Sequence, residues 1–194
     1  MPHLDPVDAD TDDPVLRNVF DVFVDSGRDV PMLYRLLGNS PDMLAAWVGL
    51  AWPLRAQPTT SRALRELIIM RIAVLTQASY EWSAHWPAAL KAGVTTPQLR
   101  ALGIGAASDE FDAAQRATLR CTDEIILDGG ASASAMAELR MHFSDGECVE
   151  LVLTATFYAC VSRTLASLGL EADAPPDEPS RAMFDAIVES MPSR

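Results

Sequence analysis

An apolar run at residues 67–75 constrains the fold of this chain more than any other feature. It reads Leu-Ile-Ile-Met-Arg-Ile-Ala-Val-Leu, and Ser61 ahead of it is a suitable helix N-cap. We therefore expect a helix from Ser61 to about Gln77. Because apolar residues cover nearly its whole circumference, other helices or another subunit must cover its flanks. The run thus predicts a central helix that the rest of the fold surrounds.

The rest of the chain carries helix signals rather than strand signals. Asp13-Pro14 and Ser40-Pro41 each pair a cap residue with a proline. Ser144 to Glu147 fits a capping box ahead of a long apolar stretch that closes at Gly169. The β-branched residues lie inside helical patterns. We predict an all-α fold, a bundle of about nine or ten helices.

Composition indicates one domain with an extension at each end. A chain of 194 residues that is 49% hydrophobic can bury one sizeable core. Residues 1–12 are acidic and have few large apolar side chains, which predicts a disordered acidic lead. We expect residues 13–172 to form the single helical domain. Residues 173–194 read as a linker followed by an amphipathic tail helix.

Charge excludes one class of partner. The net charge is −12 and Lys91 is the only lysine, whereas nucleic-acid binding needs clustered basic side chains. No segment has the run of about 18 uncharged apolar residues that a membrane span needs. The N-terminus also lacks the apolar region of a signal peptide. We expect a cytoplasmic protein that binds neither nucleic acid nor membrane.

The cysteines and histidines do not form a metal or redox motif. Cys121, Cys148 and Cys160 have separations that match no such spacing. We expect all three to be small buried hydrophobic residues. The three histidines are too dispersed for a histidine-rich metal site.

A polar cluster follows the apolar run. Glu81 and His85 are four residues apart, which places them on one face of a helix. Glu66 would lie about 23 Å from Glu81 on one straight helix, so it joins them only if the chain turns at 77–79. Ser79 can cap a second helix after such a turn. Two carboxylates and an imidazole would then converge, a combination that can exchange protons near neutral pH. The alternative is a simple Glu81–His85 pair on a surface helix.

The stretch around this cluster contains residues in the following order: Arg65-Glu66-Leu67, the apolar run, Tyr80-Glu81-Trp82-x-x-His85, and Ala92-Gly93-Val94. This order resembles the carboxymuconolactone decarboxylase and alkylhydroperoxidase D-like family. Residues 143–154 and 165–170 are similar to that family as well, and the resemblance covers about 30–172. It implies an alkylhydroperoxidase D-like helical bundle that assembles into homo-oligomers, from dimers to hexamers.

The peroxidase branch of that family has a Cys-x-x-Cys pair between its glutamate and its histidine. Aligned on Glu66 and His85, those cysteines would fall at Ala78 and Glu81. Thiol peroxidase chemistry needs a thiolate and a resolving thiol, and this chain has neither there. The chain therefore resembles the decarboxylase-like branch more closely.

The resemblance implies an acid/base site that uses no metal and no cofactor and acts on a small anionic or cyclic substrate. His85 would give or take the proton while Glu81 and Glu66 orient and tune it. The substrate-binding residues would be Tyr80 and Trp82 in the pocket wall and Arg71 on a substrate carboxylate. An ion pair with Glu66 is the alternative role of Arg71.

Two other functions stay open at this point. One is an alkylhydroperoxidase-related redox protein, and the other is a non-catalytic oligomeric binding module in which the Glu–His cluster only fixes two helices. The apolar surface of the central and C-terminal helices favours a homo-oligomer, because a single chain of this length has limited means to cover both.

Overall fold

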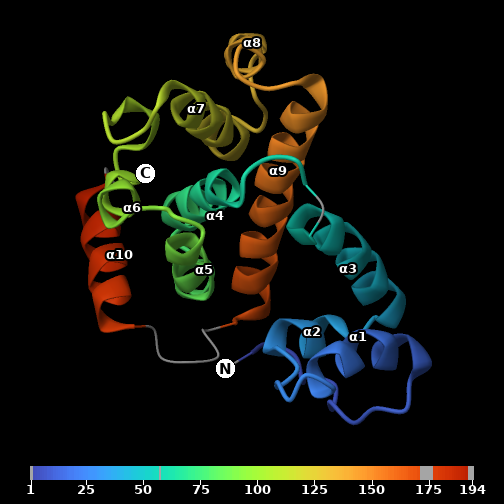
Figure 1. Cartoon of the computed structure of the whole chain (residues 1–194). Coiled ribbons are helices and arrows are strands. Elements are labelled where there is room, and N and C mark those ends of the chain that lie inside the picture. Colours follow the sequence, from blue (N-terminus) through green and yellow to red (C-terminus); the bar gives the residue numbers. More distant parts are fainter. Residues whose placement is uncertain (1, 57, 171–176, 192–194) are drawn as a thin grey trace.

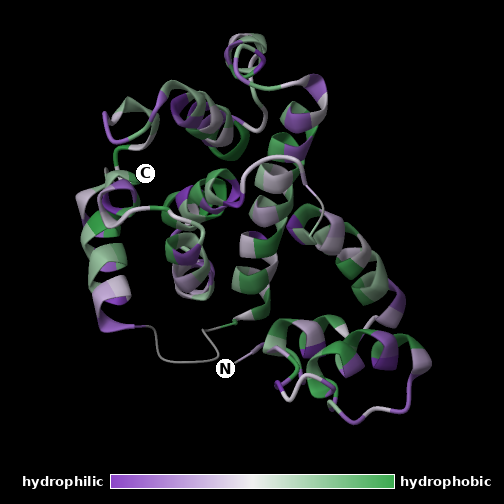
Figure 2. Ribbon diagram, viewed as in Figure 1, coloured by the Kyte–Doolittle hydropathy of each residue, from purple (hydrophilic) through white to green (hydrophobic). Residues whose placement is uncertain are grey.

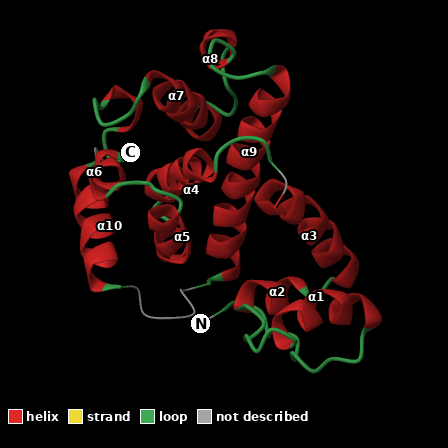
Figure 3. Cartoon of the chain, in the orientation of Figure 1, coloured by secondary structure: helices red, strands yellow, loops and turns green. Residues whose placement is uncertain are grey.

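The structure, a computed structural model, describes residues 2–56, 58–170 and 177–191 (Figure 1). Within these residues the chain is helical and has no strand, which confirms the all-α prediction (Figure 3). The elements in order are α1 (Pro14–Val24), α2 (Met32–Leu37), α3 (Pro41–Ala56), α4 (Arg62–Thr76), α5 (Ser79–Lys91), α6 (Thr96–Ala101), the 3-10 helix η1 (Gly105–Ala107), α7 (Ala113–Leu127), α8 (Ala133–Leu139), α9 (Asp145–Leu168) and α10 (Glu178–Ser190).

Helix α4 is the centre of the bundle, as the apolar run predicts. Every residue from 64 to 75 is buried, because α5, α7 and α9 pack around it (Figure 1). One side of α4 places Ile68 and Ile72 in a core cluster with α7 and α9. The other side places Leu67 and Met70 in a second cluster with α5 and α10. A helix that is apolar on all sides is stable here because both sides are covered.

The chain turns sharply between α4 and α5. Gln77 adopts a left-handed conformation (φ 55°, ψ 34°), and the Ala78 amide donates to the Ala73 carbonyl at 2.8 Å. This C-terminal closure ends α4 and reverses the chain, so that α5 packs beside α4. The predicted break is therefore present, but the predicted cap is wrong. Ser79 is the first residue of α5, and Ala78 precedes it with no side-chain cap.

The N-terminal lead differs from the prediction of a disordered segment. The His3 amide donates to the Leu168 carbonyl at 2.9 Å, at the end of α9. The Val7 amide donates to the Arg35 carbonyl at 3.0 Å, and Arg35 Nε donates back to the Val7 carbonyl at 2.8 Å. The lead is held because its backbone groups find partners on α2 and α9.

The tail helix packs on its own domain. Phe184 and Ile187 of α10 are buried against α5, and the indole Nε1 of Trp82 donates to the Ser180 carbonyl at 3.0 Å. Residues 173–176 of the predicted linker lie outside the described residues.

Helix α9 is long and apolar enough to cross a membrane by length and composition alone. Hydrophobic residues recur along its length (Figure 2). Half of its most apolar window is nevertheless buried inside the protein, where α9 packs on α3, α4 and α7. A core helix passes the same test, so the length of α9 is weak evidence for a membrane span.

The cysteines follow the prediction in part. Cys121 and Cys148 are buried, and burial raises the pKa of the Cys121 thiol to about 11. Cys160 is exposed, which corrects the expectation that all three are buried. Its position on α9 falls on the side that also exposes Val149 and Leu153.

Candidate active site

The turn after α4 brings Glu66 and His85 into direct contact. Nδ1 of His85 lies 2.9 Å from Oε2 of Glu66, a hydrogen bond between α4 and α5. The Glu66 side chain is completely buried, whereas 13% of the His85 side chain remains exposed. The imidazole therefore has one edge fixed in the interior and some access from solvent.

Arg62 completes the orientation of this pair. It lies one turn before Glu66 on α4 and forms an ion pair with Oε1 of that carboxylate. The opposite charge offsets the unfavourable burial of the Glu66 carboxylate. A carboxylate only accepts hydrogen bonds, so in the neutral imidazole this contact assigns the proton to Nδ1 and the lone pair to Nε2. Nε2 is the atom that points to Glu81.

Glu81 faces the reactive nitrogen of His85 at a distance too long for a hydrogen bond. Its Oε2 lies 3.8 Å from Nε2, and this oxygen has no hydrogen-bond partner in the described part of the chain. Burial raises the pKa of Glu81, while the charges of His85 and Arg55 oppose the rise. A buried carboxyl that holds its proton to higher pH suits general acid/base work.

Two further residues border the cluster, and the sequence did not indicate either. The Tyr158 ring on α9 meets the His85 ring edge-to-face, with centroids 5.1 Å apart. The Tyr158 hydroxyl accepts a hydrogen bond from Nε of Arg55 on α3 at 3.4 Å. Burial raises the pKa of Tyr158, which keeps its phenol protonated and able to donate. A tyrosine and an arginine 103 residues apart leave no local pattern that sequence reading could detect.

The predicted pocket residues on α5 separate onto different sides. Tyr80 is half-buried against the core cluster that includes Tyr158. Trp82 instead packs against α10, with its ring centroid 5.3 Å from that of Phe184. Its indole Nε1 also donates to the Ser180 carbonyl at 3.0 Å, so the contact with α10 fixes the Trp82 side chain. We do not keep Trp82 as a wall of this site.

Arg71 does not reach the cluster. Its Nε and Nη2 contact the two carboxylate oxygens of Asp123 at 2.7 and 3.0 Å, and Nη1 donates to the Leu102 carbonyl. Neither the predicted substrate contact nor the alternative ion pair with Glu66 is present. Five residues separate Arg71 from Glu66 on α4, which turns the two side chains in different directions. Arg71 ties α4 to α7 and to the turn after α6.

No cysteine belongs to the site in the part of the chain that the structure describes. Ala78 and Glu81 occupy the positions of a Cys-x-x-Cys pair. The described residues contain no group of three or more histidine, cysteine, aspartate and glutamate side chains that could hold a metal ion. The chemistry of the cluster therefore depends on its carboxylates, imidazole and phenol.

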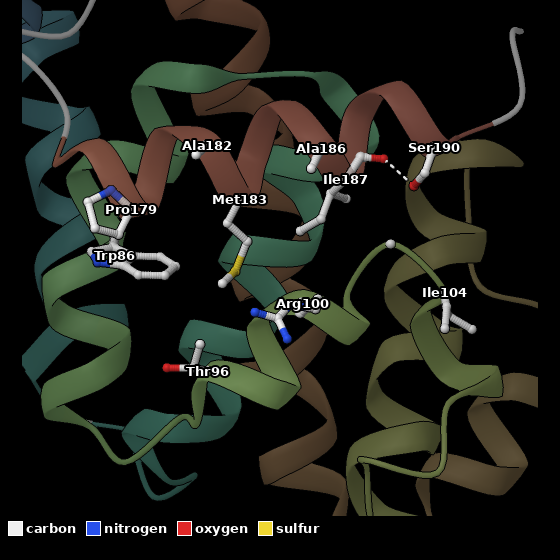
Figure 4. A pocket seen from close by; sticks show the side chains of 11 residues that line it. Trp86, Thr96, Arg100, Ile104, Pro179, Ala182, Met183, Ala186, Ile187 and Ser190 are labelled. Carbon is white, nitrogen blue, oxygen red and sulfur yellow. Dashed lines mark hydrogen bonds between the residues drawn. The ribbon is translucent and has the colours of Figure 1, made fainter.

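A separate pocket of about 780 Å³ lies between α6 and α10 (Figure 4). Met183 and Ile187 of α10 face Arg100 of α6 across it, and Trp86 closes one end (Figure 4). Among the described residues that line it, Arg100 is the only charged one, and none carries a carboxylate or an imidazole. This pocket lacks the groups for proton transfer, so the Glu66–His85–Glu81 cluster is the candidate active site.

Comparisons with known proteins bear on the family and the fold of this chain. The model of the carboxymuconolactone decarboxylase family matches residues 41–124. The curated proteins include no match to this chain. Among solved structures, the debrominase Bmp8 in its apo form is 21% identical with a TM-score of 0.73, and the alignment covers 94% of this chain and 96% of that one.

Two other structures have the same fold. An uncharacterised peroxidase-related protein with an alkylhydroperoxidase AhpD core, from Ralstonia eutropha JMP134, is 16% identical with a TM-score of 0.74, covering 94% of this chain and 96% of that one. A putative antioxidant defence protein AhpD, ATU0492 from Agrobacterium tumefaciens, is 19% identical with a TM-score of 0.64, covering 72% of this chain and 97% of that one. The segment that matches the carboxymuconolactone decarboxylase family model, residues 41–124, carries Glu66, Glu81 and His85, and the chain as a whole has the alkylhydroperoxidase D-like fold.

Proposed function

We propose that the protein is an acid/base enzyme of the decarboxylase or isomerase type that acts on a small anionic or cyclic substrate without a cofactor. The observation that carries the proposal is the oriented imidazole. Glu66 fixes Nδ1 of His85 at 2.9 Å, and the buried Glu81 lies 3.8 Å from Nε2 on the other side. This arrangement leaves one ring nitrogen and one carboxyl free to exchange a proton with a substrate.

These groups can supply and accept every proton that such a reaction moves. In decarboxylation, the bond to the substrate carboxylate breaks, CO2 leaves, and the electron pair remains as an enolate. His85 or Glu81 then delivers a proton to the carbon and recovers one from solvent. In isomerisation, His85 removes a proton from one carbon and returns it to another. The Tyr158 hydroxyl and Arg55 stand beside the cluster, where they can stabilise an enolate oxygen.

The geometry favours this proposal over the two alternatives. A thiol peroxidase needs cysteines at the site, and the nearest alignable positions hold Ala78 and Glu81. A module in which the cluster only fixes helices would have both carboxylates neutralised by arginine. Glu66 has Arg62, but no arginine forms an ion pair with Glu81 in the described residues, and His85 remains partly exposed.

The test is proton exchange in deuterated water. The protein is incubated with a panel of carboxylated lactones and β-keto acids, and deuterium incorporation and CO2 release are followed by NMR. We expect His85→Gln to reduce turnover by about 10²- to 10⁴-fold. His142→Gln, at an exposed histidine, is the matched control and should act as wild type. Unchanged turnover in His85→Gln removes this residue from the mechanism.

A hydroperoxide assay separates the redox alternative. We expect the protein not to reduce hydroperoxides. Peroxide reduction that disappears when Cys121, Cys148 and Cys160 are all replaced by serine would overturn the acid/base proposal.

A further inference from the structure

A second cavity, of about 380 Å³, opens on the N-terminal lobe between α1, α2 and α3. Its volume lies in the range of small-molecule sites. The lining residues come from all three helices and from the loop after α1. They are Asn18, Val19, Val22, Phe23, Arg28, Tyr34, Val48, Trp52 and Arg55.

The charge of this cavity is opposite to that of the protein. The described residues that line it include two arginines and no acidic residue, in a chain whose net charge is −12. Within the described residues, no carboxylate forms an ion pair with Arg28 or Arg55. Arg28 lies over the Phe23 ring at 5.1 Å, and Arg55 Nη1 donates to the Tyr34 hydroxyl at 3.1 Å. Two guanidinium groups without a counter-charge are suited to an anionic ligand.

Apolar and aromatic side chains form most of the remaining lining. Trp52 is 59% exposed and Val22 is 54% exposed, although both are large hydrophobic side chains. The Phe23 and Tyr34 rings pack with centroids 5.3 Å apart. An aromatic wall beside paired cations favours a ligand with a planar or cyclic body and a carboxylate at one end.

Arg55 links this cavity to the candidate active site. It lines the cavity and donates through Nε to the hydroxyl of Tyr158, whose ring contacts His85. The positive charge of Arg55 also interacts with Glu81 and opposes the rise in the pKa of that carboxyl. An anion held by Arg55 would therefore lie at the side of the cavity nearest the Glu66–His85–Glu81 cluster.

We propose that Arg55, together with Arg28, forms the carboxylate anchor of a ligand cavity for small cyclic carboxylates. Arg55 takes the place that the sequence assigned to Arg71. The binding itself is independent of catalysis, whereas the delivery of the ligand to His85 rests on the proposed function. Arg55 is thus a specificity-determining residue rather than a proton-transfer group.

Benzoate and cyclohexanecarboxylate are the probes, and benzamide is the neutral match for benzoate. Binding to the full chain is measured by calorimetry and by intrinsic fluorescence. We expect saturable binding of the carboxylates below about 10 mM and at least tenfold weaker binding of benzamide. Trp52→Phe should remove most of the fluorescence response while leaving calorimetric binding detectable.

Substitutions of the two arginines test which of them holds the carboxylate. We expect Arg55→Gln to weaken benzoate binding at least tenfold, Arg28→Gln to weaken it less, and Arg55→Lys to restore part of the loss. Arg17→Gln, on the same lobe but outside the cavity, is the matched control and should bind as wild type. His85→Gln should also bind benzoate as wild type does, because His85 does not line this cavity.

Three results would overturn the proposal. They are no saturable binding of either carboxylate, equal binding of benzoate and benzamide, and unchanged binding in both Arg55→Gln and Arg28→Gln. If the fluorescence of Trp52 changes on dilution of the protein but not on addition of benzoate, this surface instead contacts a second copy of the chain. Benzoate binding without any substrate turnover would retain the anchor and refute the proposed function alone.

Discussion

The hydrogen bond between Glu66 and His85 joins residues that are 19 apart in the sequence and lie on the neighbouring helices α4 and α5. It exists only because the chain reverses at Gln77, and it sets which nitrogen of the imidazole is free. A single turn therefore determines the chemistry available to the site. The first prediction follows from this contact.

Glu66→Gln should lower turnover by about 10- to 10³-fold, because an amide does not impose one tautomer on His85 as a carboxylate does. The pH–rate profile of the variant should also shift, which a merely structural effect would not cause. Glu66→Asp, which keeps the charge, should recover part of the activity. An unaltered profile in Glu66→Gln would show that this carboxylate does not tune the imidazole.

Glu81→Gln should stabilise the folded protein near neutral pH. The folded-state pKa of Glu81 is raised by burial, so its ionisation is more costly in the folded chain than in the unfolded one. The wild type therefore loses stability as pH rises from the ordinary carboxyl value of 4.5 through the raised folded-state pKa. We expect the melting temperature of the variant to exceed that of wild type at about pH 7–8, and the difference to shrink towards pH 4.5.

The exposed residue Glu189 provides the control for this experiment. Glu189→Gln should show no comparable pH-dependent gain. A Glu81→Gln protein that is less stable than wild type at neutral pH would contradict the burial argument.

Gln77→Gly should stabilise the protein by up to about 1 kcal/mol, because glycine adopts the left-handed conformation of this turn without strain. Gln77→Val should destabilise it by about 1–3 kcal/mol, since a β-branched residue is strongly disfavoured at positive φ. Urea denaturation measures both changes. Equal stability of the two variants would mean that the turn does not depend on this conformation.

Gly105→Ala should destabilise the fold by about 1–3 kcal/mol. Gly105 has φ +73°, and an added Cβ would lie 2.7 Å from Nη2 of Arg71. The substitution thus combines backbone strain with displacement of the guanidinium from Asp123. Gly129→Ala also replaces a positive-φ glycine but meets no atom within 4 Å, so it isolates the backbone contribution. The difference between the two variants measures the contact with Arg71.

We predict a homo-oligomer that covers the outer side of α9. Val149 is 57% exposed and Leu153 is 40% exposed on this side. Replacing both by serine should reduce the mass seen by light scattering at micromolar concentration. Met141→Ser, at a residue that is 74% exposed before α9, should leave the mass unchanged. A monomeric mass for the wild type would contradict the prediction.

Some parts of this molecule follow from local sequence. The run at 67–75 predicts α4 because a helix that is apolar on all sides must be central, and the capping box at Ser144 locates the start of α9. The sequence predicted the break before α5, but it did not predict which residue forms the turn. A left-handed glutamine is uncommon, whereas Ser79 gave an ordinary cap signal that the structure does not use.

Other parts depend on packing that no local pattern reports. Trp82 and Arg71 sit close to the site in sequence, yet the rotation of each helix turns their side chains elsewhere. Tyr158 and Arg55 are distant in sequence and reach the cluster only because α9 packs on α4 and α3 packs on α9. Assigning these four residues requires the relative rotation of the helices, which sequence periodicity does not supply.

The position of α4 between two core clusters has a consequence for how proteins of this fold can diversify. Any rotation of α4 about its axis would expose apolar residues on one side and crowd the other, so the direction of Glu66 is fixed by the whole interior. The interior therefore keeps the proposed proton-transfer residues in one arrangement. Changes of substrate would then arise in the outer helices α1 and α3, where the exposed Trp52 can be replaced without disturbing that interior.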